Sequence, residues 1–356
     1  MKTRIFNLFQ RDRGIFAGAY GGYFRWTLIV MVILTPLFFF AGNGLLIQLI
    51  IIYSILALSY DFFSGYTGYY NLGFGAISAV GAYTFTFVSN AGVNVFVALL
   101  IAGIMGGIFA LGISYPFLRL RGAYFAIATL ALVLFLDIAD INLTPYTGGE
   151  VGLHVFISTQ IASYNGSLLF LLGTLLLLLA CLSVHFTIGR SRLGLALRSI
   201  REEEDVSESY GVNAFRIKQI VLLLSGFFGG LGGAVFAIYF GFINPDNVLG
   251  LSTALLPVVA SMIGGPGIFL GPLVGGFVLE GINLTLPTYI DTINPSYNFI
   301  GPLVVTGVLL LIVGLFLPTG IVRLRFLQKY MYRNPDRFLT LRRRATTTET
   351  ETKEKH

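Results

Sequence analysis

The sequence predicts an all-α fold, a polytopic bundle of about ten transmembrane helices. Hydrophobic residues occupy 55% of the 356 positions and charged residues only 11%, whereas soluble domains carry about 25% charged residues. Apolar runs approaching the roughly 20 residues that a helix needs to cross a bilayer recur along the whole chain. The basic residues are confined to a few segments outside these runs. Together these observations place the chain in a membrane.

The apolar runs give ten candidate spans. They lie at roughly 26–42, 45–63, 72–90, 94–118, 122–142, 167–187, 219–243, 252–265, 268–286 and 299–318. The run at 252–265 is short and is interrupted by glycine and proline at 264–267, so a full crossing there is open at this point. The first run lacks a small-residue cleavage site and is interpreted as a retained helix. The expected domains are an N-terminal segment 1–25, a membrane domain 26–318 and a tail 319–356.

The positions of lysine and arginine set the orientation. All 23 fall before the first span, between the fourth and fifth, within 189–218, or after the tenth. With ten spans and the N-terminus inside, all four regions are cytoplasmic, as the positive-inside rule requires. We therefore expect a multi-pass protein of the cell (plasma or inner) membrane with both termini in the cytoplasm. The basic part of the tail is expected to contact lipid headgroups and its end to be disordered, and no nucleic-acid partner is expected.

Glycine is abundant, with 43 residues that cluster inside or beside the spans. Small residues let membrane helices approach closely, and glycine with proline at membrane depth also marks broken helices around a cavity. Both explanations are open. Glycine-rich stretches near 64–82 and 264–276 flank the charged segment and hint at two structural repeats.

The segment 189–218 has the pattern of a surface helix. Leu193, Leu197 and Ile200 recur at i, i+4 and i+7 and form one helical stripe. An isolated charged helix of this length gains little stability alone. The pattern therefore predicts one or two short amphipathic helices that dock into a groove on a partner; the alternative is an ordinary solvated loop.

Charged pairs and a glycine complete this prediction. Arg198 with Glu202, and Arg201 with Asp205, are spaced so that they can pair across one helical turn. Gly211 follows the last periodic position and suits a left-handed helix cap.

Through its Gly194, its run Ala196 to Arg201 and its Gly211-Val212-Asn213 turn, the segment 189–218 resembles the cytoplasmic coupling loop of permease subunits of branched-chain amino acid ABC importers, the LivM-like family, and we call it the coupling segment. The resemblance is carried by Gly194, Ala196-Leu197-Arg198-Ser199-Ile200-Arg201, the acidic residues 202–205 and Gly211-Val212-Asn213. Asp205-Val206-Ser207 keeps the spacing of the general permease signature but not its residues. The resemblance implies that the residues coupling this chain to an ATPase are Arg198, Arg201, Glu202, Glu204, Asp205, Glu208 and Gly211.

Further motifs extend the resemblance over about 260 residues. They are the stretches 58–83, 121–130, 147–153, 263–272 and 318–320. The family usually has Asn near position 61, where this chain has Asp61. The resemblance implies ten helices, a second permease subunit of the LivH-like kind, two cytoplasmic ATP-binding subunits and an external solute-binding protein. The chain has no phosphate-binding loop of its own, so we expect it to bind no cofactor and its partners to hydrolyse ATP.

Acidic residues at membrane depth are candidates for the translocation pathway. An ionisable group near the bilayer centre should face a cavity or be protonated. Glu280 lies nearest a span centre and Asp61 lies near the cytoplasmic end of its span, and both are candidates, while Asp137 and Asp140 lie near the outer end of a span and can reach water. The other candidates are Asn71, Thr147, Gly148, Gly149, Gly264 and Gly265. His154 and His185 have no second ligand at metal spacing, so no metal site is expected.

The sequence thus predicts a channel-forming permease subunit of an ABC importer for branched-chain amino acids. One alternative is an ABC permease for urea, short amides or another small solute. Another is a secondary transporter driven by protons through Glu280 or Asp61. No catalytic constellation of an intramembrane enzyme is found in the sequence, so enzymatic activity is not expected.

Overall fold

The computed structural model describes residues 44–156, 164–293 and 320. Several predicted parts of the chain lie outside these residues. They are the N-terminal segment, the runs 26–42 and 299–318, and the tail apart from Gly320. The chain divides into two compact units at residue 49. Apart from the first residues of one helix, all described residues belong to the second unit.

The described elements are almost entirely helical, as predicted. In chain order they are α2 (Gly44–Thr67), α3 (Phe74–Asn90), α4 (Val95–Phe117), α5 (Ala123–Asn142), α6 (Thr144–Thr147), the 3-10 turn η1 (Gly149–Val151), β1 (Leu153–His154), α8 (Tyr164–Arg190), α9 (Arg192–Glu202), α10 (Glu204–Ser209), α11 (Ala214–Phe240), β2 (Phe242–Ile243), α12 (Pro245–Val248), α13 (Leu251–Gly264) and α14 (Gly271–Ile293). The two short strands pair antiparallel, with Leu153 opposite Ile243. This small sheet is the one departure from the all-α prediction among the described residues.

Six helical segments of the described chain are long and apolar enough to cross a membrane. They are Ile47–Thr67, Val95–Phe117, Ala123–Asn142, Leu169–Arg190, Ala214–Phe240 and Pro245–Gly264. The last of these joins α12 to α13, so the run expected at 252–265 is extended to 20 residues at its N-terminal side. A polytopic helical membrane protein is thereby confirmed, while the number of ten spans stays a prediction.

Glycine lets α11 pack closely against α3 and α4. A Cβ at Gly106 of α4 would lie 2.5 Å from the carbonyl oxygen of Gly226, and one at Gly230 would lie 2.5 Å from that of Ala102. Gly81 of α3 faces the backbone of Gly230 in the same way. These contacts support the packing explanation for glycine in this part of the chain, because no side chain larger than hydrogen fits between the backbones.

The helices differ in which faces they bury. Over the residues whose side chains are described, α2 is buried almost all round. In contrast, α4, α5 and α8 carry outward apolar residues such as Phe96, Phe135 and Leu169. An apolar outward face is what a helix in contact with lipid chains presents, because those chains are as apolar as leucine.

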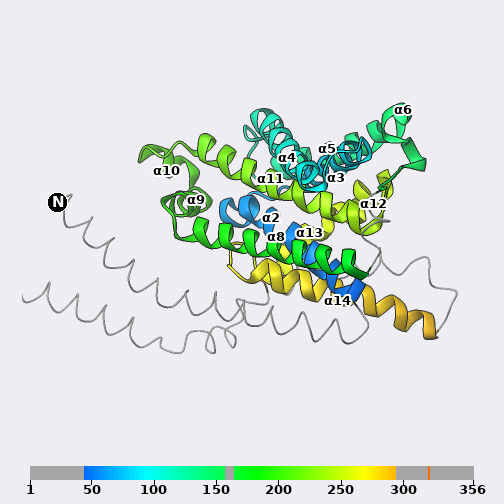
Figure 1. Ribbon diagram of the computed structural model, residues 1–356. Helices are drawn as coiled ribbons and strands as arrows, with labels where there is room; N and C mark the ends of the chain where they lie inside the picture. The colour runs from blue at the N-terminus through cyan, green and yellow to red at the C-terminus, as the bar shows by residue number, and fades with distance from the viewer. Residues whose placement is uncertain (1–43, 157–163, 294–319, 321–356) are drawn as a thin grey trace, which may run out of the picture. The chain divides into compact units, whose positions relative to one another are not determined.

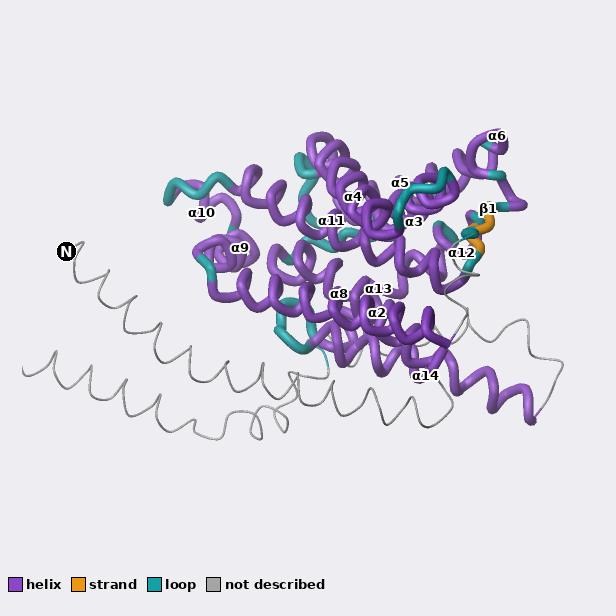
Figure 2. The backbone as a smooth tube through the Cα atoms, viewed as in Figure 1, coloured by secondary structure: helices purple, strands orange, loops and turns teal. Residues whose placement is uncertain are grey.

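The coupling segment and the loop-rich segments lie at opposite ends of the helices (Figure 1, Figure 2). The helices α9 and α10 lie at one end, at the left in both views. The short helices α6 and α12 and the strand pair lie at the other end. The fold therefore separates the charged helices from α6, which ends at Thr147, by the length of the long helices.

Candidate functional site

The coupling segment forms two helices, as predicted, with a break between them. Ser191 begins α9 by accepting a hydrogen bond from the amide of Gly194 at 3.2 Å, a typical N-cap contact. Glu203 has extended backbone angles, φ −158° and ψ 110°, and it separates α9 from α10. Gly211 follows α10 with φ +85°, and its amide donates to the Glu208 carbonyl at 2.9 Å. The predicted glycine cap is confirmed.

The apolar stripe holds α9 against the rest of the protein. Leu197 and Ile200 are buried, and Leu193 is half-buried. Gly194 lies against the carbonyl of Ile188 with no room for a side chain. The stripe therefore faces the membrane domain of this same chain, and the opposite face of α9 is free to meet a partner.

The two ion pairs expected inside the coupling segment do not form in the described structure. The extended backbone of Glu203 interrupts the helix, so Arg201 and Asp205 are no longer one turn apart. Arg201 instead donates to the Gly65 carbonyl at 2.8 Å. Arg198 donates to the Gly189 carbonyl at 3.4 Å rather than pairing with an acid.

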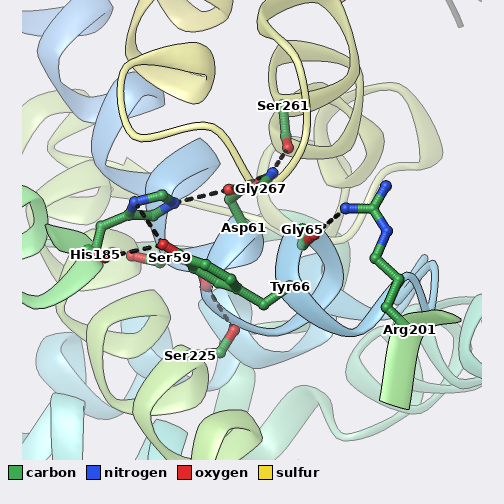
Figure 3. A network of polar contacts seen from close by, with 9 residues as sticks. All are labelled: Ser59, Asp61, Gly65, Tyr66, His185, Arg201, Ser225, Ser261 and Gly267. Carbon is green, nitrogen blue, oxygen red and sulfur yellow. Dashed lines mark hydrogen bonds and ion pairs between the residues drawn. The ribbon is translucent and has the colours of Figure 1, made fainter. Parts of the chain in front are cut away.

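The side chain of Arg201 lies against three glycines, Gly65, Gly68 and Gly267, which we call the Arg201 seat. Its Nη1 binds the Gly65 carbonyl in the last turn of α2 (Figure 3), where carbonyl groups lack a helical partner. A Cβ at Gly68 would lie 2.9 Å from Cγ of Arg201, and one at Gly267 would lie 3.2 Å from its Nη1. The two glycine-rich stretches seen in the sequence thus meet at one arginine of α9.

A second contact fastens α10 to α11 and to the loop after α2. Lys218 Nζ lies 2.7 Å from Glu204 Oε1, with side chains 1% and 14% exposed. The hydroxyl of Tyr69 donates to the other oxygen of Glu204, and Lys218 lies over the Tyr69 ring at 4.5 Å. Burial and the hydrogen bond to Glu204 raise the pKa of Tyr69 above its ordinary value. Glu204 is therefore an internal support of the coupling segment.

The third contact is an exposed ion pair. Asp205 accepts from Arg121 at 2.8 Å, and the two side chains are 73% and 56% exposed. The hydrogen bond and charge of Asp205 raise the pKa of Arg121. This pair joins α10 to the loop between α4 and α5, and solvent screens it.

The outer face of the coupling segment combines exposed charges with exposed apolar groups. Arg198, Glu202 and Glu208 are exposed. Beside them are Leu195, Val206 and Tyr210, of which Tyr210 is 85% exposed. This mixed surface can contact a soluble partner, since apolar anchors within a polar surround are typical of protein interfaces.

Asp61 is the centre of a buried polar cluster close to Arg201. Its side chain is fully buried. One carboxylate oxygen accepts from the Ser261 hydroxyl at 2.6 Å, and the other lies 2.9 Å from Nε2 of His185. The amide of Gly267 donates to both oxygens, at 3.1 and 3.0 Å. We call Asp61, Tyr66, His185, Ser261 and Gly267 the Asp61 cluster; Figure 3 shows that it joins α2, α8, α13 and the loop after α13.

Glycine also makes room for this carboxylate. Asp61 folds back along its own helix over Gly65, where any Cβ would collide with it. One turn of α2 therefore presents Asp61 to the cluster and the Gly65 carbonyl to Arg201. The structure places Asp61 among packed helices, and its position on a translocation pathway stays a prediction.

Asn71 shapes the loop between α2 and α3. Its side-chain oxygen accepts from the Gly73 backbone amide at 3.1 Å. The backbone amide of Asn71 donates to the Ser64 hydroxyl at 3.2 Å. This is an Asx-turn leading into α3. The side chain is buried, so a role for Asn71 in the pathway stays a prediction as well.

The predicted pathway residues Thr147, Gly148 and Gly149 form a tight turn at the opposite end. Thr147 donates to the Asp140 carbonyl at 2.7 Å, and both glycines have positive φ, 78° and 57°. The carboxylate of Asp140 accepts from Tyr83. The turn is thus fixed to the end of α5, and its contact with a solute is untested.

Gly264 and Gly265 form the turn that joins α13 to α14. Gly264 packs on the backbone of Gly271, and Gly265 has φ +114°. Glu280 lies further along α14, is 4% exposed, and leaves Oε2 without a hydrogen-bond partner. The three residues belong to one hairpin, but the glycines are separated from Glu280 by more than two helical turns.

Sequence reasoning missed several partners of these residues. The sequence pattern points to His185 only as a possible metal ligand, and it does not mark Tyr69, Arg121, Lys218 or Ser261 as site residues. Asp61 and His185 both fall near the inner ends of their predicted spans. An acid and an imidazole at the same depth in the membrane are a signal that could have suggested the contact between their side chains.

Comparison with known proteins places the chain among transport permeases. The family described as "Branched-chain amino acid transport system / permease component" matches residues 44–314. The high-affinity branched-chain amino acid transport system permease protein LivM of Escherichia coli (strain K12) is 31% identical over 266 residues, 67% of this chain and 62% of the relative. BraD, the corresponding permease protein of Pseudomonas aeruginosa, is 23% identical over 76% of this chain and 91% of its own.

A third relative carries a different name. The autoinducer 2 import system permease protein LsrC of Yersinia pseudotuberculosis serotype IB is 27% identical over 66% of this chain and 67% of its own. The match to LivM covers less than two thirds of that relative's length. No solved structure matches the chain. Since the family match spans most of the helices described above, the chain belongs to the family of permease components of branched-chain amino acid transport systems.

Proposed function

We propose that this chain is the membrane-spanning permease subunit of an ABC importer. It forms part of the translocation pathway for branched-chain amino acids and is powered by two cytoplasmic ATP-binding subunits. The other partners are a second permease of the LivH-like kind and an external solute-binding protein. The chain crosses the membrane ten times, with both termini in the cytoplasm, and it binds no cofactor of its own.

The observation that carries this proposal is the arrangement of the coupling segment. Its buried stripe and three polar contacts fix it to the ends of α2, α11 and the loop before α5. Its outer face leaves Leu195, Val206 and Tyr210 uncovered. A segment tied to several membrane helices and open on the other side can pass movement of a docked ATPase to those helices.

We assign different roles to the seven coupling residues. Arg201 and Glu204 hold the segment in place through the Gly65 carbonyl and Lys218, and Asp205 holds α10 to Arg121. Arg198, Glu202 and Glu208 contact the ATPase directly, because they are exposed. Gly211 ends α10 and sets the direction in which the chain enters α11.

A docking test should change the outer face alone. Tyr210→Ala and Val206→Asp should weaken co-purification of the ATP-binding subunits and lower solute uptake, because they remove apolar anchors. The matched control is Tyr146→Ala, since Tyr146 is 72% exposed at the opposite end. Unchanged association in both Tyr210 and Val206 variants, with full uptake, would contradict docking at this face.

The pathway residues are part of the same proposal. Glu280 is buried in the membrane domain with one free carboxylate oxygen, and it is suited to meet the ammonium group of an amino acid. Thr147, Gly148 and Gly149 would shape the external entrance, and Gly264 and Gly265 the inner turn. Glu280→Gln is expected to reduce uptake while leaving ATPase association unchanged.

A different solute is the nearest alternative, because LsrC is named for autoinducer 2 import. Uptake assays with labelled leucine against urea and short amides distinguish the solutes. The free oxygen of Glu280 also favours a second candidate, proton-driven transport without ATPases. Proton-dependent uptake in liposomes that contain this chain alone would support that candidate and refute the ABC mechanism.

A further inference from the structure

Glu280 and Asn283 lie on the face of α14 that packs against α2. Together with Gly276 they recur at i, i+4 and i+7, so the three positions share one helical stripe. A Cβ at Gly276 would lie 2.8 Å from Oγ of Ser54 and 3.0 Å from its Cα. Glu280, one turn further along α14, is 4% exposed. The stripe therefore places both polar side chains where α14 meets the rest of the membrane domain.

The two side chains lack hydrogen-bond donors. They are hydrogen-bonded to each other. Oε2 of Glu280 and Oδ1 of Asn283 are buried and have no hydrogen-bond partner in the part of the chain that the structure describes. The bond between the side chains therefore runs from Nδ2 of Asn283 to Oε1 of Glu280. Two acceptor oxygens are left on one helical face, and because buried polar atoms are nearly always paired, they mark a place for a bound group.

No basic side chain of this chain is available to them. The sequence has no lysine or arginine in the ranges 26–118, 122–189 and 219–322. The basic residues of α11 lie in its first turns, where Lys218 pairs with Glu204. A positive group that meets Glu280 therefore comes from another molecule.

The chemistry of the two oxygens favours an ammonium group. A primary ammonium has three N–H donors and one positive charge, so it can satisfy a carboxylate oxygen and an amide oxygen together. A metal ion needs more ligands, and the described residues contain no group of three His, Cys, Asp or Glu side chains that could hold one. The donor-deficient pair thus fits an organic amine better than a metal.

Aromatic side chains border the same region. The charge of Glu280 acts on the phenol groups of Tyr53 in α2 and Tyr239 in α11. Tyr53 meets Phe236 edge to face, with ring centroids 6.2 Å apart. Phe240 lies 4.4 Å from Phe236 and 5.1 Å from Tyr239 between ring centroids. Aromatic rings attract cations and pack against apolar groups, so these surroundings fit an ammonium group on an apolar body.

We propose that Oε2 of Glu280 and Oδ1 of Asn283 form a two-oxygen subsite for the primary ammonium group of an apolar amino acid or amine. Glu280 supplies the charge and Asn283 the second acceptor, and together they favour an ammonium over a neutral amide of similar shape. The subsite deepens the proposed function and rests on it, because a solute meets these residues only if the chain lines the translocation pathway.

Binding is tested by saturation-transfer NMR on the purified full chain in nanodiscs, since this method detects weak binding. The probes are leucine, 3-methylbutylamine, which keeps the ammonium and the branched chain, and 4-methylpentanamide, which is neutral. Leucine and the amine should bind, and the amide should bind at least about ten-fold more weakly, because it offers no charge to Glu280. Absence of binding by leucine and the amine, or equal binding of amine and amide, would overturn the subsite.

Two variants test the residues separately. Asn283→Leu removes the second acceptor and should raise the Kd of leucine and of the amine about ten-fold. Its matched control is Asn142→Leu, at an exposed asparagine of α5, which should change neither constant. Glu280→Gln should abolish the preference for amine over amide, an effect that a merely structural role would not produce.

Folding losses do not remove the test. If Asn283→Leu does not fold, Asn283→Ser keeps a polar but shorter side chain and should give the same rise in Kd. If Glu280→Gln does not fold, the variants at Asn283 decide. Unchanged constants in the folded Asn283 variant, or an unchanged preference for the amine in folded Glu280→Gln, would overturn the subsite.

Failure of the proposed function would look different. The NMR measurement uses neither ATP nor ATP-binding subunits, so it reports on the subsite alone. Binding that depends on Glu280 and Asn283, in a chain that associates with no ATP-binding subunit, would refute the ABC mechanism and keep the subsite. ATP-driven uptake of leucine that neither substitution alters would refute the subsite and keep the ABC mechanism.

Discussion

Two pairs of acidic and basic side chains have nearly equal lengths but lie in opposite surroundings. Nε2 of His185 is 2.9 Å from Asp61 with both side chains 0% exposed, and Arg121 is 2.8 Å from Asp205 with side chains 56% and 73% exposed. When one partner of the buried pair is removed, water cannot reach the remaining side chain to replace the lost hydrogen bond. Removing one partner of the exposed pair lets water take its place. Burial, rather than distance, therefore decides what each pair contributes.

The pair of Lys218 and Glu204 lies between these extremes. It measures 2.7 Å, and its side chains are 1% and 14% exposed. All three pairs hold helix ends around the coupling segment, so their ranking can be tested in one protein with the same measurements. The ranking also separates residues that set the position of α9 from residues that only border it.

The largest effect is expected at the fully buried pair. Asp61→Ala should lower the free energy of unfolding by about 3–5 kcal/mol, because it leaves the Ser261 hydroxyl, the Gly267 amide and the ring of His185 buried without their hydrogen-bond partner. Denaturant titration in detergent measures this loss. Glu150→Ala, at an exposed acid in the turn η1, serves as the control and should change little. Equal losses in the two variants would show that burial does not set the ranking.

The intermediate pair should give a smaller loss. Lys218→Met leaves Glu204 without its cation and should cost about 3 kcal/mol, while the Tyr69 hydroxyl still donates to Glu204. Adding Glu204→Gln removes the unpaired charge, so the double variant should recover part of the loss. Strictly additive losses in this double-mutant cycle would mean that Lys218 and Glu204 act independently.

Much of the helical layout could be predicted from the sequence. The runs 94–118 and 122–142 agree closely with α4, Val95–Phe117, and α5, Ala123–Asn142. The cap at Gly211 and the stripe through Leu197 were also correct, because apolar periodicity and glycine with positive φ are local properties. The break at Glu203 was not predicted, since no glycine or proline marks it and an extended glutamate leaves no composition signal.

The site was less predictable than the helices. Asp61 and His185 are 124 positions apart in sequence. Hydropathy gives the depth of such residues in a span but not the direction in which they point. The pairing of Arg201 with Asp205 followed from helical spacing, and it failed because tertiary contacts with Gly65 and Arg121 prevailed. Which charged side chains meet depends on how the helices face each other. A single sequence does not contain that relative orientation.

A glycine substitution can separate backbone strain from loss of the Arg201 seat. Gly68 and Gly92 have similar angles, φ +75° and +85°, but Gly68 faces Arg201 whereas nothing lies within 4 Å of a Cβ at Gly92. Each change to alanine should cost about 1–2 kcal/mol of strain. Only Gly68→Ala should also displace Arg201 and reduce uptake per ATP hydrolysed. Equal uptake by the two variants would argue against a role for this seat.

The smallest effect is expected at the exposed pair. Arg121→Gln removes a charge that solvent screens, so the melting temperature in detergent should stay within the error of the measurement. Because Asp205 also loses its link to the loop before α5, any change in uptake should shrink as salt is raised, since salt already weakens the pair in the unaltered protein. A large loss of stability in Arg121→Gln would place this pair with the buried ones despite its exposure, and the ordering by burial would then be wrong.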